Sequence, residues 1–503
     1  MRADGIERDS ARLLGVGYGQ MAAAVLVSVL LFRLAALLFN RTDLFFDESQ
    51  YWAWSREPAF GYYSKPPMIA WVIRAATWVC GDGEACVRAG SPLLHTLTGG
   101  VLYFLGRKLY GPAAGFWAAI CYVTLPGVAY SAGLMSTDVP LLLCWAAALL
   151  ALVALIERIE SGRQALGPAL ALGLAVGFGL NAKYAMAYFI LCAVLYLLAT
   201  PARRHLLKDR RVLAAFTLGL LLIIPNILWN ASNSFATFAH TADNANWRTG
   251  ALLRPLKALE FFGSQFGVFG PVLFGTLLVI AWRAWRTKPP EADRLLMWFA
   301  LPILSIVTTQ ALLSRAHANW AAPAFVAATV LVVGVMVREA SWGWLKISLF
   351  VGGLVTLAIP AVLASADTIP LPRPNPLERV IGWKELANVT RASLEEARKE
   401  GRPFAAVLTN DRAVTATLLY YLRDENVPVK AWRAAQKPRD HFELTRPFRG
   451  GKGPVLLVSL SNEVGGIEKN FRSVKLLRSV ATNAGLRQKR TIHLYLLDGH
   501  VAG

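Results

Sequence analysis

The amino-acid sequence predicts an all-α polytopic membrane protein with about eleven transmembrane helices, followed by a small C-terminal α/β domain. Of its 503 residues, 55% are hydrophobic and only 17% are charged, whereas a soluble protein of this length carries charge on about a quarter of its residues. Runs of about 20 apolar residues, the length that crosses a hydrocarbon core of roughly 30 Å, recur through the first 365 positions. Beyond residue 366, short apolar runs alternate with amphipathic stretches, which is typical of an α/β domain.

The first predicted span follows a short charged N-terminal segment. The apolar run at 21–39 is too long for a signal-peptide core and has no small-residue cleavage site, so we expect it to be retained. The eleven predicted spans cover roughly residues 20–40, 90–106, 112–131, 138–157, 167–181, 184–200, 212–230, 258–282, 295–313, 318–337 and 344–365.

The loops between these spans predict the orientation in the membrane. Lys and Arg concentrate in alternate loops such as "PARRHLLKDRR" and "WRAWRTKPPEADR". Cytoplasmic loops collect positive charge, so these loops and the N-terminus are predicted to be cytoplasmic. The same bias accounts for the net charge of +20 and, with no basic domain present, argues against a nucleic-acid partner. The other loops, and the chain after residue 366, then lie outside the cytoplasm, which in a bacterium means the periplasm.

The tail predicts a second domain. Four prolines between residues 370 and 376 predict a stiff linker. Beyond it, 383–401 reads as an amphipathic helix, "PFAAVLTN", "GPVLLVSLS" and "TIHLYLL" as strands, and the segment from residue 412 to 427 as a helix. We therefore predict a transmembrane domain at 1–366 and a periplasmic α/β domain at 367–503.

Two adjacent carboxylates, Asp47 and Glu48, begin the first periplasmic loop. That loop is rich in Trp and Tyr, and the segments "YWAWSREP" and "PPMIAWVIRAATWV" read as amphipathic helices that lie in the membrane interface. The next periplasmic loop carries one charge, Asp138, directly before a span. Asp138 could simply cap that helix. Because the three carboxylates lie on the same side of the membrane at a similar depth, we instead expect Asp47 and Asp138 to converge over one cavity.

Cations and aromatic residues occupy the other periplasmic loops. Lys65, which stands before the Pro66–Pro67 pair, is a candidate for binding a phosphate. Alternatively, its aliphatic stem lies in the apolar region and its ammonium group extends to the membrane interface. Further polar candidates are Lys183 in a tight turn, His240 in a long loop of lid-like size, and Arg315, His317, Asn319 and Trp320 before the tenth span.

Cys80 and Cys86 flank a Gly-Asp-Gly turn in the first periplasmic loop. If this loop faces an oxidising compartment, a local disulfide is expected. No other Cys or His stands nearby at ligand spacing, so a metal site formed by these cysteines is not favoured.

The order of these motifs resembles a known family. "FFDES", "YWAW", "KPPM", "STDVPL" and "HANWAAPAF" are similar to motifs of the bacterial polyprenyl-phosphate-sugar glycosyltransferases of the GT-C superfold. That group includes lipid A aminoarabinose transferases, rhizobial galacturonosyltransferases and protein O-mannosyltransferase-like enzymes. The resemblance covers the spans to about residue 365 and the segment "NPLERVIGWKELA".

The resemblance implies an inverting transfer of a sugar from a polyprenyl phosphate to an acceptor outside the cytoplasm, with lipid A or lipopolysaccharide core as the expected acceptor. It implies Asp47 as the base, Asp138 across the same cavity, and Lys65 on the donor phosphate. Some family members bind a divalent cation near the acidic pair, so Asp47 and Asp138 are also candidate metal ligands. To these assignments we add Glu48 as a catalytic candidate, Arg315 and Lys183 at the phosphate, and substrate contacts from Tyr62, Tyr63, His240, His317, Asn319 and Trp320.

Two other classes of protein remain open at this point. A lipid-linked sugar transporter or flippase would carry charges near mid-membrane, where Arg33 is the clearest candidate and has no assigned role. A polysaccharide ligase or polymerase would use a diphosphate donor and more periplasmic Arg and His. The sequence leaves the sugar and the acceptor undetermined.

Overall fold

The computed structural model describes residues 12–13, 16–245, 253–368, 377–483 and 489–501, and the predicted proline-rich linker at 370–376 lies outside them. The described chain forms two compact units. The first comprises Met1–Leu38, Lys65–Ile69 and Arg88–Pro360, and the second comprises Phe39–Ser64, Ala70–Val87 and Ala361–Gly503. Most of the first predicted periplasmic loop therefore groups with the C-terminal residues, and not with the spans that flank it.

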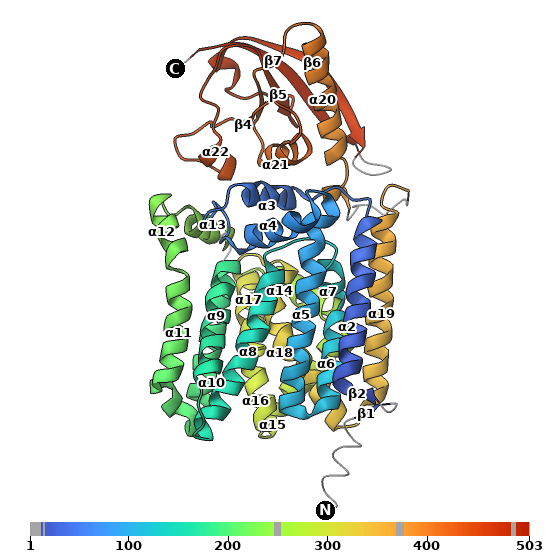
Figure 1. Ribbon diagram of the computed structural model, residues 1–503, viewed down its shortest axis with the longest axis vertical. Helices are drawn as coiled ribbons and strands as arrows, with labels where there is room; N and C mark the ends of the chain where they lie inside the picture. The colour runs from blue at the N-terminus through green and yellow to red at the C-terminus, as the bar shows by residue number, and fades with distance from the viewer. Residues whose placement is uncertain (1–11, 14–15, 246–252, 369–376, 484–488, 502–503) are drawn as a thin grey trace, which may run out of the picture. The chain divides into compact units, whose positions relative to one another are not determined.

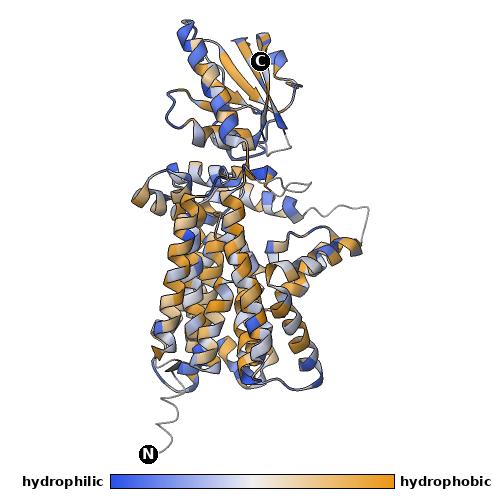
Figure 2. Ribbon diagram, turned by 90° about the vertical axis from the view of Figure 1, so that its right-hand side faces the viewer, coloured by the Kyte–Doolittle hydropathy of each residue, from blue (hydrophilic) through white to orange (hydrophobic). Residues whose placement is uncertain are grey.

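The first unit is helical and multi-spanning. Figure 1 shows its long helices running roughly parallel, and Figure 2 shows hydrophobic residues along most of their length. After the short pair β1 (Arg12–Leu13) and β2 (Val16–Gly17), its helices are α2 (Tyr18–Leu38), α5 (Glu84–Tyr110), α6 (Pro112–Val123), α7 (Pro126–Ser131), α8 (Asp138–Glu160), α9 (Leu166–Ala182), η1 (Tyr184–Met186), α10 (Ala187–Ala199), η2 (Pro201–Lys208), α11 (Arg210–Leu222), α12 (Ile224–Ser232), α13 (Ala236–Ala245), α14 (Pro255–Val268), α15 (Pro271–Arg286), α16 (Glu291–Trp298), α17 (Leu301–Leu313), η3 (Ala318–Ala321), α18 (Ala322–Arg338) and α19 (Trp342–Ala364).

Among the described residues, six helices are long and apolar enough to cross a membrane, and a bent pair brings the number to seven. The six are Tyr18–Leu38, Asp138–Glu160, Arg210–Ser232, Glu291–Leu313, Ala318–Arg338 and Trp342–Ala364. Several of the other predicted spans correspond to shorter apolar helices, such as α6 and α9. The chain is thus a multi-pass membrane protein.

One predicted span is not a continuous helix. The sequence favoured a single span at 258–282, but α14 and α15 meet there at an angle of 117°. Gly270 has a φ of +88°, and Pro271 follows it as the first residue of α15. A left-handed glycine ends a helix and proline cannot continue one, so the apolar run folds as two helices.

Burial identifies the centre of this unit. In α8 and in the segment of η3 and α18, 72% and 83% of the most apolar window is buried, compared with 11% in α19. The central helices pack large side chains such as Trp145, Leu149 and Phe325. Arg33, within α2, is also buried and donates a hydrogen bond to the carbonyl of Val123.

Small residues set the position of α9 against α11. A Cβ at Gly173 would lie 2.7 Å from the carbonyl oxygen of Ala215, and one at Gly177 would lie 2.6 Å from Leu222 Cδ1. Without a hydrophobic driving force in lipid, such close approach of helix backbones is a main source of association. The packing fixes the C-terminal end of α9, where Lys183 follows.

The second unit combines helices of the first loop with a mixed sheet. Its elements are α3 (Phe46–Arg56), α4 (Met68–Cys80), η4 (Glu378–Val380), α20 (Trp383–Lys399), β3 (Ala406–Thr409), α21 (Arg412–Tyr421), β4 (Val429–Ala431), α22 (His441–Thr445), β5 (Val455–Ser459), η5 (Glu468–Asn470), β6 (Phe471–Asn483) and β7 (Lys489–His500). The strand order is β4-β3-β5-β7-β6; β3 pairs in parallel with β4 and β5, and β7 pairs antiparallel with β5 and β6. The predicted small C-terminal sheet domain is confirmed.

Candidate functional site

The candidate residues fall into two groups, one in each unit. Asp138, Lys183 and Asn319 lie in the first unit, and Asp47, Glu48, Tyr62 and Tyr63 lie in the second. Asp47 and Asp138 thus belong to different units, and their predicted convergence over one cavity stays a prediction.

Asp138 is the centre of the first group. Its Oδ1 accepts a hydrogen bond from Lys183 Nζ at 2.6 Å, and its Oδ2 accepts one from Asn319 Nδ2 at 2.7 Å. The side chains of Asp138 and Lys183 are only 10% and 21% exposed. The structure thus brings together three predicted site residues from three different loops.

Asp138 does not act as a helix cap. It is the first residue of α8, after the N-cap Thr137, and no side-chain capping bond is made at this end. Its carboxylate bonds go to η3 and to the turn after α9, while the helix N-terminus favours its negative charge. Lys183 is the C-cap of α9 and has an extended backbone conformation. Its backbone N–H donates to the carbonyl of Gly179, which fixes its position at the end of the helix.

A polar network that the sequence analysis missed follows Lys183. Tyr184 donates its hydroxyl to Asn226 Oδ1 at 2.7 Å, and Asn230 Nδ2 lies 3.3 Å from the Tyr184 oxygen. Asn230 Oδ1 also accepts from the backbone N–H of Thr237. Both asparagines are fully buried. A buried side-chain amide without a hydrogen-bond partner is costly. Two asparagines four residues apart in the apolar run "PNILWN" were therefore the sequence signal that could have predicted this network.

The other candidates of the first unit lie near loop ends. Lys65 is half-buried, whereas Arg315 and His317 are exposed. The His317 and Trp320 rings meet edge to face at 5.4 Å. His240 lies half-buried on α13.

Asp47 anchors the second group. It is the second residue of α3, and its Oδ1 accepts a hydrogen bond from Arg412 Nη1 at 2.8 Å. The same Arg412 nitrogen donates to Gln50 Oε1 at 2.9 Å, and its guanidinium carbon lies 4.9 Å from the centre of the Phe46 ring. The side chain of Asp47 is 32% exposed, so this carboxylate is accessible as well as paired.

Glu48, next to Asp47, is in a different environment. It is 1% exposed, and its Oε2 accepts from the backbone N–H of Phe45 at 2.9 Å. Phe45 is the N-cap of α3, so this hydrogen bond stabilises the start of the helix. The predicted catalytic role of Glu48 stays a prediction.

Tyr62 and Tyr63 lie in the segment between α3 and α4. Tyr62 is 1% exposed, stacks on Trp54 with ring centres 4.5 Å apart, and donates its hydroxyl to the Trp54 carbonyl. Burial raises the pKa of Tyr62 to about 12. Tyr63 donates to the carbonyl of Pro438 at 3.0 Å. Both tyrosines therefore contribute to packing within the second unit.

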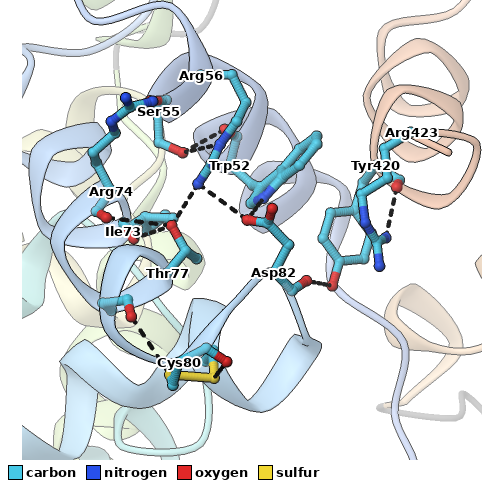
Figure 3. Close-up of polar contacts among 12 residues, drawn as sticks. Trp52, Ser55, Arg56, Ile73, Arg74, Thr77, Cys80, Asp82, Tyr420 and Arg423 are labelled. Carbon is cyan, nitrogen blue, oxygen red and sulfur yellow. Dashed lines mark hydrogen bonds and ion pairs between the residues drawn. A yellow bond between two sulfur atoms is a disulfide. The ribbon is translucent and has the colours of Figure 1, made fainter.

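A disulfide joins Cys80 and Cys86. The enclosed loop presents Asp82, whose Oδ1 accepts from Trp52 Nε1 at 2.8 Å and pairs with Arg56 at 3.1 Å. The backbone oxygen of Asp82 accepts from the hydroxyl of Tyr420 at 2.6 Å. Figure 3 shows these contacts linking α3, α4 and the loop to α21.

The two candidate metal ligands, Asp47 and Asp138, lie in different units, so a divalent cation held between them stays a prediction. Within the described residues, no group of three or more His, Cys, Asp and Glu side chains could hold a metal ion. Both oxygens of Asp138 accept from nitrogen donors, and one donor is an ammonium group that would face the cation. Asp47 likewise faces a guanidinium group. Each carboxylate thus has a cationic side chain bonded to one of its oxygens.

Arg412 is a further site residue that sequence reasoning missed. It lies 365 residues after Asp47, in a segment that reads only as an ordinary helix. An arginine at the start of a helix in a separate predicted domain carries no local signal for a partner so far away in the chain.

Comparisons with known proteins agree with the resemblance. A family profile described as dolichyl-phosphate-mannose-protein mannosyltransferase matches residues 64–229. The lipid A galacturonosyltransferase RgtD of Rhizobium johnstonii is 36% identical over 422 residues, covering 83% of this chain and 86% of that protein. The undecaprenyl phosphate-alpha-4-amino-4-deoxy-L-arabinose arabinosyl transferase of Edwardsiella ictaluri is 25% identical over 55% of this chain and 50% of its own length.

A solved structure shows the same fold. The crystal structure of ArnT from Cupriavidus metallidurans bound to undecaprenyl phosphate matches with a TM-score of 0.63 at 18% sequence identity, covering 94% of this chain and 97% of that one.

Proposed function

This chain belongs to the GT-C family of polyprenyl-phosphate-sugar glycosyltransferases, and we propose that it transfers galacturonic acid from a polyprenyl phosphate to lipid A. One observation carries the choice of sugar and acceptor. The relative that is 36% identical over most of both chains is a lipid A galacturonosyltransferase. Among the relatives matched at lower identity, one is a lipopolysaccharide core galacturonosyltransferase. Others are transferases of 4-amino-4-deoxy-L-arabinose, which makes that sugar the second candidate.

The proposed reaction is a single displacement with inversion. An acceptor hydroxyl oxygen forms a bond to the anomeric carbon of the sugar, and the bond between that carbon and the phosphate oxygen of the carrier breaks. The hydroxyl proton goes to Asp47, and the bonding electrons leave with the polyprenyl phosphate. A carboxylate that is one-third exposed and oriented by a cation suits this role as general base.

Positive charge is needed where the phosphate leaves. Lys65, Lys183 and Arg315 are the proposed donors to the phosphate oxygens, because charge that develops on a leaving group is stabilised by positioned cations. In this proposal Asp138 holds Lys183 in place through the 2.6 Å bond, and Asn319 holds Asp138. The Asp138 group is then the phosphate side of the site, and Asp47 the acceptor side.

The finer topology is part of the same proposal. We place Asp47, Asp138 and the sheet domain on the periplasmic side of a bacterial inner membrane, because positive charge gathers in the loops of the opposite side. About eleven crossings fit if the shorter apolar helices also span the membrane. Tyr62, Tyr63, His240, His317 and Trp320 remain proposed substrate contacts.

The test is transfer by the purified protein in proteoliposomes with lipid A as acceptor. Undecaprenyl phosphate carrying galacturonic acid and undecaprenyl phosphate carrying aminoarabinose are supplied in parallel, and lipid A is analysed by mass spectrometry. We expect the mass increase of one galacturonosyl group from the first donor only. Transfer from the second donor alone would replace the sugar, and no transfer from either, while the Rhizobium johnstonii relative is active, would refute the function.

A further inference from the structure

Arg412 is fixed at the start of α21 by the local sequence. Asp411 is the N-cap of this helix, and its Oδ1 accepts from the backbone N–H groups of Ala413 at 2.7 Å and Val414 at 3.1 Å. A side-chain cap of this kind stabilises a helix start by about 1 kcal/mol. The residue that follows the cap therefore projects from a defined point.

From that point Arg412 makes three contacts with the first turn and a half of α3. Its Nη1 donates to Asp47 Oδ1 at 2.8 Å and to Gln50 Oε1 at 2.9 Å, and the guanidinium covers the Phe46 ring at 4.9 Å. Three contacts restrict a planar guanidinium far more than one ion pair does. Within the described chain, Asp47 Oδ2 accepts no hydrogen bond, so one oxygen is held by Arg412 and the other has no hydrogen-bond partner there.

The packing of α21 against α3 holds this arrangement in register. The rings of Trp52 and Tyr420 meet edge to face at 5.0 Å, and Ala53 packs on the cluster that contains Ala416. At the far end of α21, Tyr420 donates to the Asp82 carbonyl, and the Tyr421 hydroxyl accepts from the backbone N–H of Leu44 at 2.9 Å. Figure 3 shows Tyr420 reaching the loop that the disulfide closes.

We propose that Arg412, contributed by the C-terminal sheet domain, is a positioning residue for transfer: it holds one oxygen of the Asp47 carboxylate so that the other faces the acceptor hydroxyl. This inference rests on the proposed function, in which Asp47 is the base. It gives the C-terminal domain a defined task in the reaction. Misplacing a reacting group by about 1 Å can lower a rate roughly a hundredfold.

A purely structural role for Arg412 makes a different prediction. Its side chain is 36% exposed and that of Asp47 is 32% exposed, and ion pairs of such exposure contribute at most about 1 kcal/mol to stability. A structural role would thus give a small loss of thermal stability and no selective loss of kcat. The two roles are separable by kinetics.

The experiment compares Arg412→Ala, Arg412→Lys and Arg423→Ala in proteoliposomes with undecaprenyl phosphate-galacturonic acid and lipid A. Arg423 is the matched control, because it lies just beyond α21 and contacts Tyr420, not Asp47. We expect Arg412→Ala to lower kcat by about 10- to 100-fold with a donor KM within about twofold of wild type. Arg412→Lys should recover part of this loss, and Arg423→Ala should behave as wild type.

A double variant tests whether Arg412 acts through Asp47. Asp47→Asn combined with Arg412→Ala should be no slower than Asp47→Asn alone, because residues that act as one unit are not additive. An unchanged or raised kcat in Arg412→Ala, an equal loss in Arg423→Ala, or full additivity in the double variant would overturn the positioning role. Activity of the wild-type protein in the same assay keeps the proposed function separate from this result.

Discussion

The two acidic groups differ in how their carboxylates are held, although both stand at the start of a helix. Asp138 is buried, and each of its oxygens accepts a hydrogen bond, one of them from an ammonium group. Asp47 is one-third exposed and has a single oxygen bonded to Arg412. A carboxylate with both oxygens occupied is suited to orient its partners, whereas one with an accessible oxygen can take a proton.

The Asp138–Lys183 pair is more buried than the Asp47–Arg412 pair, and this difference in burial determines how much each ion pair contributes to stability. Separating a buried carboxylate from its cation leaves an uncompensated charge in a medium of low dielectric constant. At the more exposed pair, water replaces the lost partner. The Asp138 group should therefore control stability and phosphate contact, and the Asp47 group should control the chemical step.

The largest expected effect separates the two carboxylates by rate. Asp47→Asn should lower kcat by about 10²- to 10⁴-fold, the usual contribution of a general base, and leave thermal stability nearly unchanged. Asp138→Asn should cause a smaller loss of kcat, since it disturbs Lys183 and removes no base. Initial rates of lipid A modification with matched thermal unfolding curves measure both. Near-normal transfer by Asp47→Asn would remove Asp47 as the base.

The sequence predicted the Asp138 group more fully than the Asp47 group. Asp138, Lys183 and Asn319 each stand beside a span, and a polar or ionisable residue at such a boundary is conspicuous by itself. The partner of Asp47 comes from a pairing between helices of two predicted domains. No periodicity or local motif reports a contact of this kind, because it depends on how α21 packs against α3.

The fold shows the same division. The helix at 383–401 and the three apolar strands were predicted, because amphipathic and apolar runs have a clear period. The strand β6, "FRSVKLLRSVATN", was missed; it is an edge strand rich in charge and mostly exposed, which is how edge strands avoid aggregation. The break between α14 and α15 was also missed, since the apolar run continues through Gly270 and Pro271.

A second prediction sharpens the contrast in burial. Lys183→Met removes the ammonium from Asp138 and should destabilise the protein by about 3 kcal/mol, because the carboxylate stays buried. Adding Asp138→Asn to this variant should restore much of the stability. The more exposed Asp47 pair serves as the control, since Arg412→Ala should cost at most about 1 kcal/mol. Equal losses of melting temperature in the two single variants would contradict the distinction.

A third prediction concerns the loop that supports the Asp47 group. Replacing Cys80 and Cys86 by Ala should destabilise the second unit by about 2 kcal/mol, because the disulfide closes a short loop in the unfolded chain. Cys144→Ala is the control, as this cysteine forms no disulfide. Thermal unfolding with and without a reducing agent measures the effect. A wild-type protein insensitive to reduction would remove the loop as a support for α3 and α21.

The last prediction is a dependence of stability on pH that belongs to the second unit. Burial, with the nearby charge of Arg446, lowers the pKa of His441 to about 3, and its ring packs against Trp54 and Tyr62. Between pH 3 and its ordinary value of about 6.5, His441 is neutral in the folded protein and protonated in the unfolded chain. The unfolded state then binds more protons, so stability is full above about pH 6.5 and falls as the pH falls toward 3, by at most about 1.4 kcal/mol per pH unit.

His441→Gln should remove this slope. The difference in melting temperature between wild type and variant, followed from pH 7.5 to about pH 5, isolates the contribution of His441 from that of the carboxyl groups. His205→Gln is the matched control, because this exposed histidine lies on η2 of the first unit. An unchanged slope in His441→Gln would mean that the ring is solvated in the folded protein, and the packing of α22 on Trp54 would then not support the helix that carries Asp47.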